Sequence, residues 1–184
     1  MTNKLPTLAF LLAGACALPA SAQEIRPGLW ELSSQFTSPD AKVQSAMSSM
    51  QQRLANLPPE QRAQLEQTLR QNGVQLDIGG GGQLRTKICM TKEMAARKEF
   101  PVQQGDCTQK YTPQAGGKGQ VAFSCTKPRI SGNGEITMID DKNYRANMRV
   151  TNAEQGSQVV DTNVTGRWLS ADCGGLKPMT APAG

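Results

Sequence analysis

The sequence predicts an α+β fold, in which a curved, mostly antiparallel β-sheet of meander topology carries an inserted αα-hairpin that covers one face. Three observations predict it. Several short runs alternate apolar and polar residues, which is the period of strands with one buried face. Clusters of glycine, asparagine and aspartate separate many of these runs. Residues 38–73 change instead to a helical period.

The first 22 residues have the pattern of a secretory signal peptide. Lys4 supplies positive charge, residues 8–18 are an almost unbroken apolar run, and Ala20-Ser21-Ala22 is a small-x-small site. We therefore expect cleavage between Ala22 and Gln23. The apolar run is too short for a membrane span, which needs ~20 residues. A lipoprotein signal at Cys16 is the alternative, but the usual aliphatic residue three positions upstream is missing.

After the signal peptide, residues 23–178 are predicted to form a single β-rich domain, with residues 179–184 as a flexible tail. The full chain has 20 Lys and Arg residues against 15 Asp and Glu residues, a formal net charge of +5. This mild excess specifies no partner. The mature chain contains no second apolar run of membrane-spanning length, so we expect no stable membrane insertion.

Residues 30–36 predict the first strand of the mature chain. Trp30, Leu32 and Phe36 fall on alternate positions, which gives the strand one apolar face. Polar residues stand between them: Glu31, Ser33 and Gln35.

Residues 38–73 predict a helical hairpin. Ser38-Pro39-Asp40 offers an N-cap, a first-turn proline and a first-turn acid. Pro58-Pro59 separates two helices, and Asn72-Gly73 supplies a left-handed exit. Apolar residues recur at spacings of three or four and form an apolar stripe: Val43, Met47, Met50, Leu54 and Leu57 in the first helix, and Leu65 and Leu69 in the second. All of them except Leu57 make up a candidate ligand or partner face.

The simplest role of this hairpin is to cover the sheet, because a sheet with one apolar face needs a cover. Binding to a membrane surface is disfavoured, since only Lys42 and Arg53 are basic in the first helix. A partner-gripping or ligand-gating role stays open. Met47 and Met50 are adaptable side chains, and proline and glycine hinges flank the insertion.

Residues 79–82 are four glycines. A phosphate-binding loop would end in G-K-[ST] and lead into a helix, whereas here the strand-like run QLRTKICM follows. We expect a flexible return to the sheet. In residues 84–90 the even positions are apolar or small, and Thr91 can then cap a short helix, KEMAARKE.

The second half predicts an antiparallel meander. Folding the chain about Asp141 sets Met138 opposite Tyr144, and folding it about Glu154 sets Met148 opposite Val160. Both folds put the even positions on one face, and a slip of one residue would turn every side chain over. The even positions therefore form the buried face, and the wet face carries Arg145, Asn147, Arg149, Asp161 and Asn163.

Two clusters predict the turns of this meander, Gly132-Asn133-Gly134 and residues 140–143. Upstream, residues 121–125 alternate as one more strand. Asp140-Asp141 is the only adjacent acidic pair, and its place in a turn cluster predicts solvation rather than acid–base chemistry.

Four cysteines remain after the signal peptide: Cys89, Cys107, Cys125 and Cys173. An even number in an exported chain predicts two disulfides. Folding the chain about Gly116 sets Cys107 opposite Cys125, within disulfide reach, which leaves Cys89 for Cys173. The alternative, Cys89–Cys107 with Cys125–Cys173, is nearly as plausible and stays open.

No catalytic, metal or cofactor site is predicted, and we expect no enzyme. The sequence has no histidine, which excludes catalytic triads, Cys-His pairs and histidine-ligated metals. Zinc binding and redox catalysis are disfavoured, because no C-x-x-C pair is present. Nucleic acid is not an expected partner, since basic residues are dispersed and both tryptophans fall on core faces.

Several motifs resemble the exported bacterial family called domain of unknown function 3617: PGLWE at 27–31, LPPEQRAQLE, ICMTKE at 88–93 and the later cysteines. The resemblance covers residues 25–174. It implies a periplasmic or secreted location in the envelope of a Gram-negative bacterium, four cysteines, a β-rich fold and no assigned activity. The ending WLSADCG departs from the shorter run into G-D-C expected of the family. No functional residue can be carried over.

The expected function is that of an exported, soluble binding protein. It would engage an envelope protein or a small apolar ligand between the sheet and the helical hairpin. A structural or stress-related periplasmic protein without a ligand is the alternative.

Overall fold

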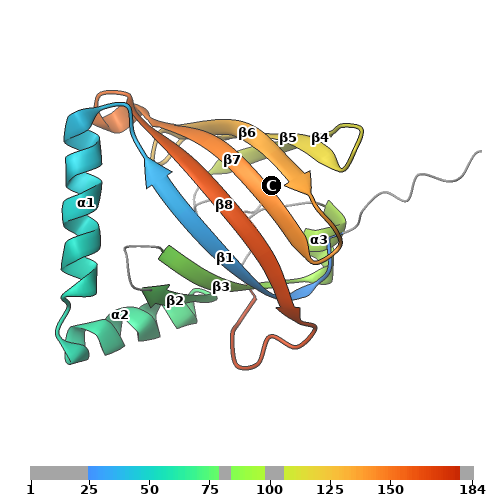
Figure 1. Cartoon of the computed structure of the whole chain (residues 1–184), viewed down its shortest axis with the longest axis horizontal. Helices are drawn as coiled ribbons and strands as arrows, with labels where there is room; N and C mark the ends of the chain where they lie inside the picture. Colours follow the sequence, from blue (N-terminus) through green and yellow to red (C-terminus); the bar gives the residue numbers. More distant parts are fainter. Residues whose placement is uncertain (1–24, 79–83, 98–105, 179–184) are drawn as a thin grey trace, which may run out of the picture.

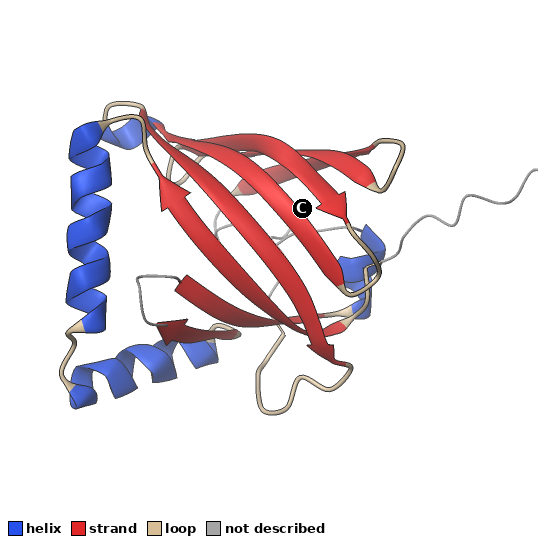
Figure 2. Ribbon diagram, in the orientation of Figure 1, coloured by secondary structure: helices blue, strands red, loops and turns tan. Residues whose placement is uncertain are grey.

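The computed structural model describes residues 25–78, 84–97 and 106–178. Their strands form one eight-stranded sheet in the order β2-β3-β1-β8-β7-β6-β5-β4 (Figures 1 and 2). The strands are β1 (Gly28–Thr37), β2 (Val74–Ile78), β3 (Leu84–Met90), β4 (Cys107–Pro113), β5 (Lys118–Cys125), β6 (Ile130–Met138), β7 (Asn143–Asn152) and β8 (Gln158–Ser170); the helices are α1 (Ala41–Ala55), α2 (Pro59–Gln71) and α3 (Lys92–Arg97), with a 3-10 turn, η1 (Ala153–Gln155).

The predicted fold class is confirmed. Every pair of neighbouring strands is antiparallel, the sheet is strongly curved but not closed, and a helical hairpin is inserted between β1 and β2 (Figure 2). The predicted signal peptide with its Ala22–Gln23 cleavage site, the glycine run 79–82 and the tail 179–184 lie outside the described residues. Among the residues described, no helix has both the length and the apolar character needed to cross a membrane.

The predicted register of β6 and β7 is confirmed, with Met138 opposite Tyr144. The register of β7 and β8 was wrong by two residues, because Met148 lies opposite Thr162 instead of Val160. The turn between these strands is longer than a simple fold about Glu154 allows: η1 is followed by Gly156 at φ 74° and Ser157 at φ 59°. Since the shift is even, each side chain keeps its predicted face.

The predicted turn at Gly132-Asn133-Gly134 was also wrong, since these residues lie inside β6 and pair with both β5 and β7. A Cβ atom on Gly132 would lie 2.4 Å from the ring of Phe123, and one on Gly134 would lie 2.0 Å from the carbonyl oxygen of Asn147. These glycines therefore permit close cross-strand packing. The chain turns instead at residues 126–129.

The core lies on the inner face of the curved sheet. Trp30 of β1 and Tyr144 of β7 have ring centroids 5.5 Å apart, although β8 runs between their strands. Their contact depends on Gly166 of β8, where a Cβ atom would lie 2.1 Å from the Tyr144 ring. The buried cluster contains Ile25, Trp30, Ile88, Met90, Met94, Ala95, Val121, Ile136, Met138 and Tyr144.

The members of this cluster come from five strands, from α3 and from the segment before β1, so the curved sheet largely encloses its own core. α3 contributes Met94 and Ala95. As predicted, Thr91 caps this helix, and its hydroxyl oxygen accepts a hydrogen bond from the Met94 amide at 3.1 Å. The helical hairpin contributes no residue to the cluster.

The two disulfides join Cys107 to Cys125 and Cys89 to Cys173, which decides between the two pairings left open by the sequence. Cys107 lies directly opposite Cys125 in the β4–β5 pair. The Cys89–Cys173 disulfide ties the segment after β8 to β3. Leu176 of that segment is buried, which adds an apolar contact to the covalent tie.

The prediction that the apolar stripe of the helical hairpin covers the sheet is confirmed only in part. Val43 is 8% exposed, but Met50 is 61% exposed, and the other stripe residues are half-buried. α2 packs against the edge strand β2, whereas α1 runs beside the sheet and the two helices form an L (Figure 1). Because the sheet curves over its own core, the stripe is left partly uncovered.

Candidate functional site

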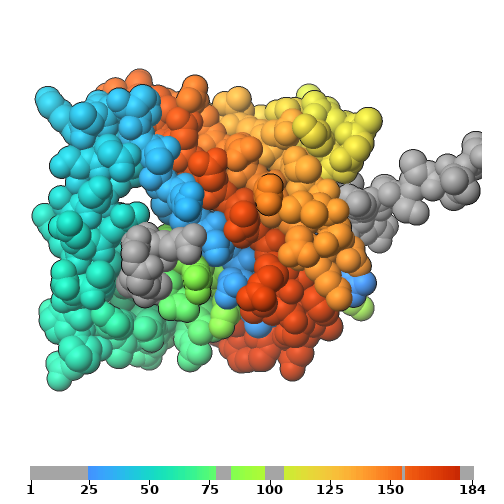
Figure 3. Space-filling view, in the orientation of Figure 1, coloured from blue at the N-terminus to red at the C-terminus, as the bar shows by residue number. Residues whose placement is uncertain are grey.

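A groove of about 660 Å³ lies between α1 and the start of β8. In the space-filling view, α1 stands apart from the strands beside it over part of its length (Figure 3). Apolar residues line both walls of the groove. Its polar residues lie at the start of α1 and at the start of β8. The lining residues are Pro39, Asp40, Lys42, Val43, Ala46, Met47 and Met50 on one side and Gly156, Ser157, Gln158, Val159 and Val160 on the other.

The groove exists because β8 is longer than β1. Pairing of β1 with β8 ends at Thr37 and Asp161, so the three preceding residues of β8 extend past the end of β1. The chain leaves the sheet at Ser38, whose hydroxyl donates a hydrogen bond to the Val159 carbonyl oxygen at 2.6 Å. α1 therefore begins next to this overhang.

The start of α1 is fixed by a cap. The Asp40 carboxylate accepts hydrogen bonds from the amides of Lys42 at 2.7 Å and Val43 at 3.4 Å, so Asp40 and not the predicted Ser38 is the N-cap. Ser38 instead bonds the sheet, and its amide donates to the Gln44 side chain at 2.9 Å. Both contacts fix where α1 leaves β1.

The structure brings together only some of the residues predicted as a ligand or partner face. Val43, Met47 and Met50 line the groove. Leu54, Leu65 and Leu69 are half-buried and lie outside its lining.

The sequence reasoning missed the β8 wall of the groove, Val159 and Val160. The fold about Glu154 set Val160 opposite Met148 on the buried face of the meander, and so inside the core. A signal was available. The predicted first strand ends at Phe36, whereas the last strand begins further away, at its turn with the preceding strand. The difference in length between these two strands indicates that the last strand extends past the end of the first.

Electrostatics single out Lys42 among the lining residues. The only other charged residue of the lining, Asp40, is engaged by two amides at the start of α1. In the described part of the chain, the Lys42 ammonium forms no ion pair. The groove thus offers an apolar surface and one unpaired cation.

The other charged clusters have structural roles. On the outer face, Arg149 donates two hydrogen bonds to Asp161, which lies opposite it on β8, at 2.7 and 2.9 Å. The Arg149 side chain lowers the pKa of Asp161. In the β6–β7 turn, hydrogen bonds from the Asn143 side chain and the Lys142 amide lower the pKa of Asp140.

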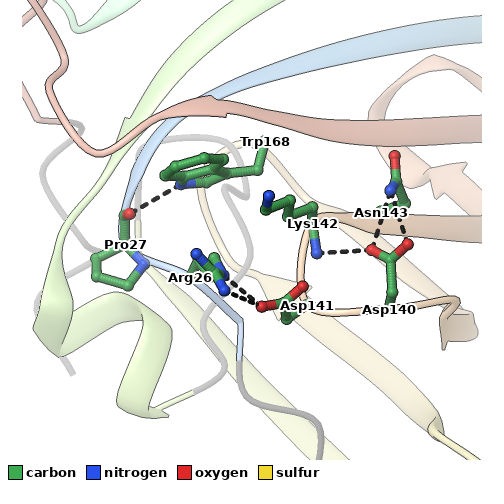
Figure 4. A network of polar contacts seen from close by, with 7 residues as sticks. All are labelled: Arg26, Pro27, Asp140, Asp141, Lys142, Asn143 and Trp168. Atoms are coloured by element: carbon green, nitrogen blue, oxygen red, sulfur yellow. Dashed lines mark hydrogen bonds and ion pairs between the residues drawn. The ribbon is translucent and has the colours of Figure 1, made fainter.

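A polar network around Trp168 anchors the start of the described chain (Figure 4). Arg26 pairs with Asp141 of the β6–β7 turn, and the Trp168 indole donates to the Pro27 carbonyl oxygen at 3.0 Å. The cations of Arg26 and Lys142 each lie 5.5 Å from the Trp168 ring centroid. Because these groups are engaged with one another through an ion pair, a hydrogen bond and cation–π contacts, we assign the network a structural role.

Metal-binding chemistry has no candidate in the ranges 25–78, 84–97 and 106–178, where no three His, Cys, Asp or Glu residues come together. The groove is therefore the best candidate site. Its residue types are those of a binding site: apolar walls with a few polar groups at one end.

Comparison with known proteins adds family membership but no activity. A family model described as "Protein of unknown function (DUF3617)" matches residues 25–173. A curated protein of Pseudomonas putida, named "Uncharacterized protein in lpd-3 5'region", is 38% identical over 144 residues, which cover 77% of this chain and 96% of the relative. No solved structure matches.

Proposed function

The chain belongs to the DUF3617 family of proteins of unknown function, and we propose that it is an exported binding protein that holds a small apolar ligand between α1 and β8. The observation that carries this proposal is the groove. Its volume of about 660 Å³ falls within the range of ~300–1,000 Å³ typical of small-molecule sites.

Part of the apolar surface of the groove lies outside the buried core, which supports a binding role. Met50 is 61% exposed, and neither Met47 nor Met50 belongs to the buried cluster. A large apolar side chain left in solvent is common, but several that line one concave surface are typical of an interaction site. The methionines also suit ligands of variable shape, because their side chains are unbranched and polarizable.

Export is supported by the cysteines. Both disulfides are of the kind that forms and persists in oxidising compartments such as the bacterial periplasm. The signal-like first 22 residues point the same way.

We also propose that the protein is not an enzyme. The sequence lacks histidine, the most frequent general acid–base residue. Among the described residues that line the groove, the only carboxylate is that of Asp40, which caps α1.

The experiment is native mass spectrometry of the full chain purified from the envelope of its own host. Wild-type protein should carry a small molecule that denaturation releases. Met50→Glu should lose that mass, because it places a charge in the groove while glutamate remains a good helix former.

The matched control is Ile139→Glu. Ile139 is the other large apolar residue exposed on the described surface, at 52%, and it lies outside the groove. This variant should keep the bound mass. A bare wild-type chain, or equal retention by the Met50 and Ile139 variants, would overturn the proposal and favour the structural, ligand-free alternative.

A further inference from the structure

If a small apolar ligand binds between α1 and β8, as proposed above, its chemical class follows from the charges and shape of the groove. We infer that this ligand is a single-chain amphiphile with an anionic head group. Its head would pair with the Lys42 ammonium, and its apolar chain would lie along Val43, Met47 and Met50.

The order of the lining residues along α1 indicates a ligand with one narrow apolar chain and a head group at one end. Lys42 stands in the first turn, whereas Met50 lies two turns further along. At ~1.5 Å of rise per residue, the distance between these two positions along the axis is about 12 Å. Val43, Met47 and Met50 follow at helical spacing and line the groove, so the apolar surface is long and narrow with a charge at one end.

The charges of the groove lead to the head group. Lys42 and Asp40 are its two charged lining residues, and they are not equivalent. Asp40 accepts hydrogen bonds from the Lys42 and Val43 amides, and the positive end of the helix dipole offsets its charge. The Lys42 ammonium has no such partner in the described chain, and a compact ammonium suits an anionic group.

The opposite wall is consistent with a chain-like ligand. Val159 and Val160 of the β8 overhang line the groove together with Met47 and Met50 of α1. An alkyl chain needs no hydrogen bonds, so it can lie between these two apolar walls without leaving a polar group unsatisfied.

The test uses three probes that share a decyl chain and differ in head charge: decanoate, decyl glucoside and decyltrimethylammonium. Each is titrated below its micellar concentration into the delipidated mature protein, residues 23–184, at low salt, with calorimetric detection. Decanoate should bind tightest. Lys42→Gln should weaken decanoate about fivefold, the upper end for an exposed ion pair, and leave the other two probes unchanged.

The matched control is Arg53→Gln, which removes one positive charge from the same helix at a position outside the groove. It should leave all three affinities unchanged. Equal loss in the Lys42 and Arg53 variants would reduce the effect to net charge and overturn the inference.

The outcomes separate this inference from the proposed function. Equal binding of the three probes, with all three weakened by Met50→Glu, overturns the anionic head and leaves the proposed groove intact. Tightest binding of the cationic probe has the same consequence. Failure of all three probes to bind overturns both.

Discussion

At the scale of single residues, Gly166 shows how one missing side chain shapes the core. Trp30 is fully buried and Tyr144 is 3% exposed, and their rings meet across β8 at Gly166. Burial also raises the pKa of the Tyr144 hydroxyl far above its ordinary value. A side chain at position 166 would occupy the space that the Tyr144 ring fills.

Gly166→Ala should therefore destabilise the protein. The new Cβ atom would lie 2.1 Å from a ring that close packing prevents from moving aside, and overpacking of this kind costs about 1–3 kcal/mol. The measurement is the free energy of unfolding by urea. Gly175→Ala is the matched control, since nothing lies within 4 Å of a Cβ atom there. Equal stability of both variants would contradict this account of the core.

The ion pair of Arg149 and Asp161 should add a pH dependence to stability. Because the folded pKa of Asp161 is lowered below 3.8, the pair stabilises the fold above that pH, and its effect is lost as the pH falls through the folded value. A double-mutant cycle with Arg149→Gln and Asp161→Asn should show favourable coupling near neutral pH that weakens as the pH falls below 3.8. Coupling that persists in acid would contradict the assignment.

Sequence reasoning at this scale succeeded for residues whose role follows from chain spacing. The Cys107–Cys125 pair and the Thr91 cap are of this kind. It failed for Gly132 and Gly134, because Gly-Asn-Gly has the chemistry of a turn. Their actual role depends on cross-strand neighbours such as Phe123, which sequence spacing does not reveal.

At the scale of elements, α1 is held mainly at its first turns. Asp40 caps it, Val43 is buried, and the Ser38 hydroxyl bonds the segment just before α1 to β8. Its later turns make few contacts with the strands and run beside the sheet (Figure 1). We therefore expect α1 to open locally at a lower free energy than the strands.

Asp40→Ala tests this attachment. Removal of an N-cap costs about 1 kcal/mol of helix stability, so amide hydrogen exchange in α1 should accelerate about fivefold. Amides of β1 and β8 should keep their exchange rates, because they lie in the ladder at the centre of the sheet. Uniform acceleration in both helix and strands would show that α1 unfolds only with the whole domain.

The existence of the helices was predictable and the placement of α1 was not. Apolar spacing and the Pro58-Pro59 pair identify both helices from local sequence alone. Where the apolar stripe packs depends on how far the sheet curves, which is set by eight strands together. The same holds for the groove, because its β8 wall comes from a segment more than 100 residues from α1.

At the scale of the whole molecule, the curved sheet and the helical hairpin have different roles. The sheet encloses its own core, and the two disulfides tie β4 to β5 and the C-terminal segment to β3. The hairpin, which contributes no residue to the buried cluster, forms one wall of the groove. This division leads to the central claim, that a ligand binds outside the core, between α1 and β8.

The most direct test of that claim is methyl NMR of the mature protein, residues 23–184, labelled at the methionine methyl groups and titrated with decanoate or decyl glucoside. Signals of Met47 and Met50 should shift saturably, because both residues line the groove. Signals of the core residues Met90, Met94 and Met138 should stay in place. Shifts confined to the core methionines, or no shift at Met47 and Met50, would contradict the claim.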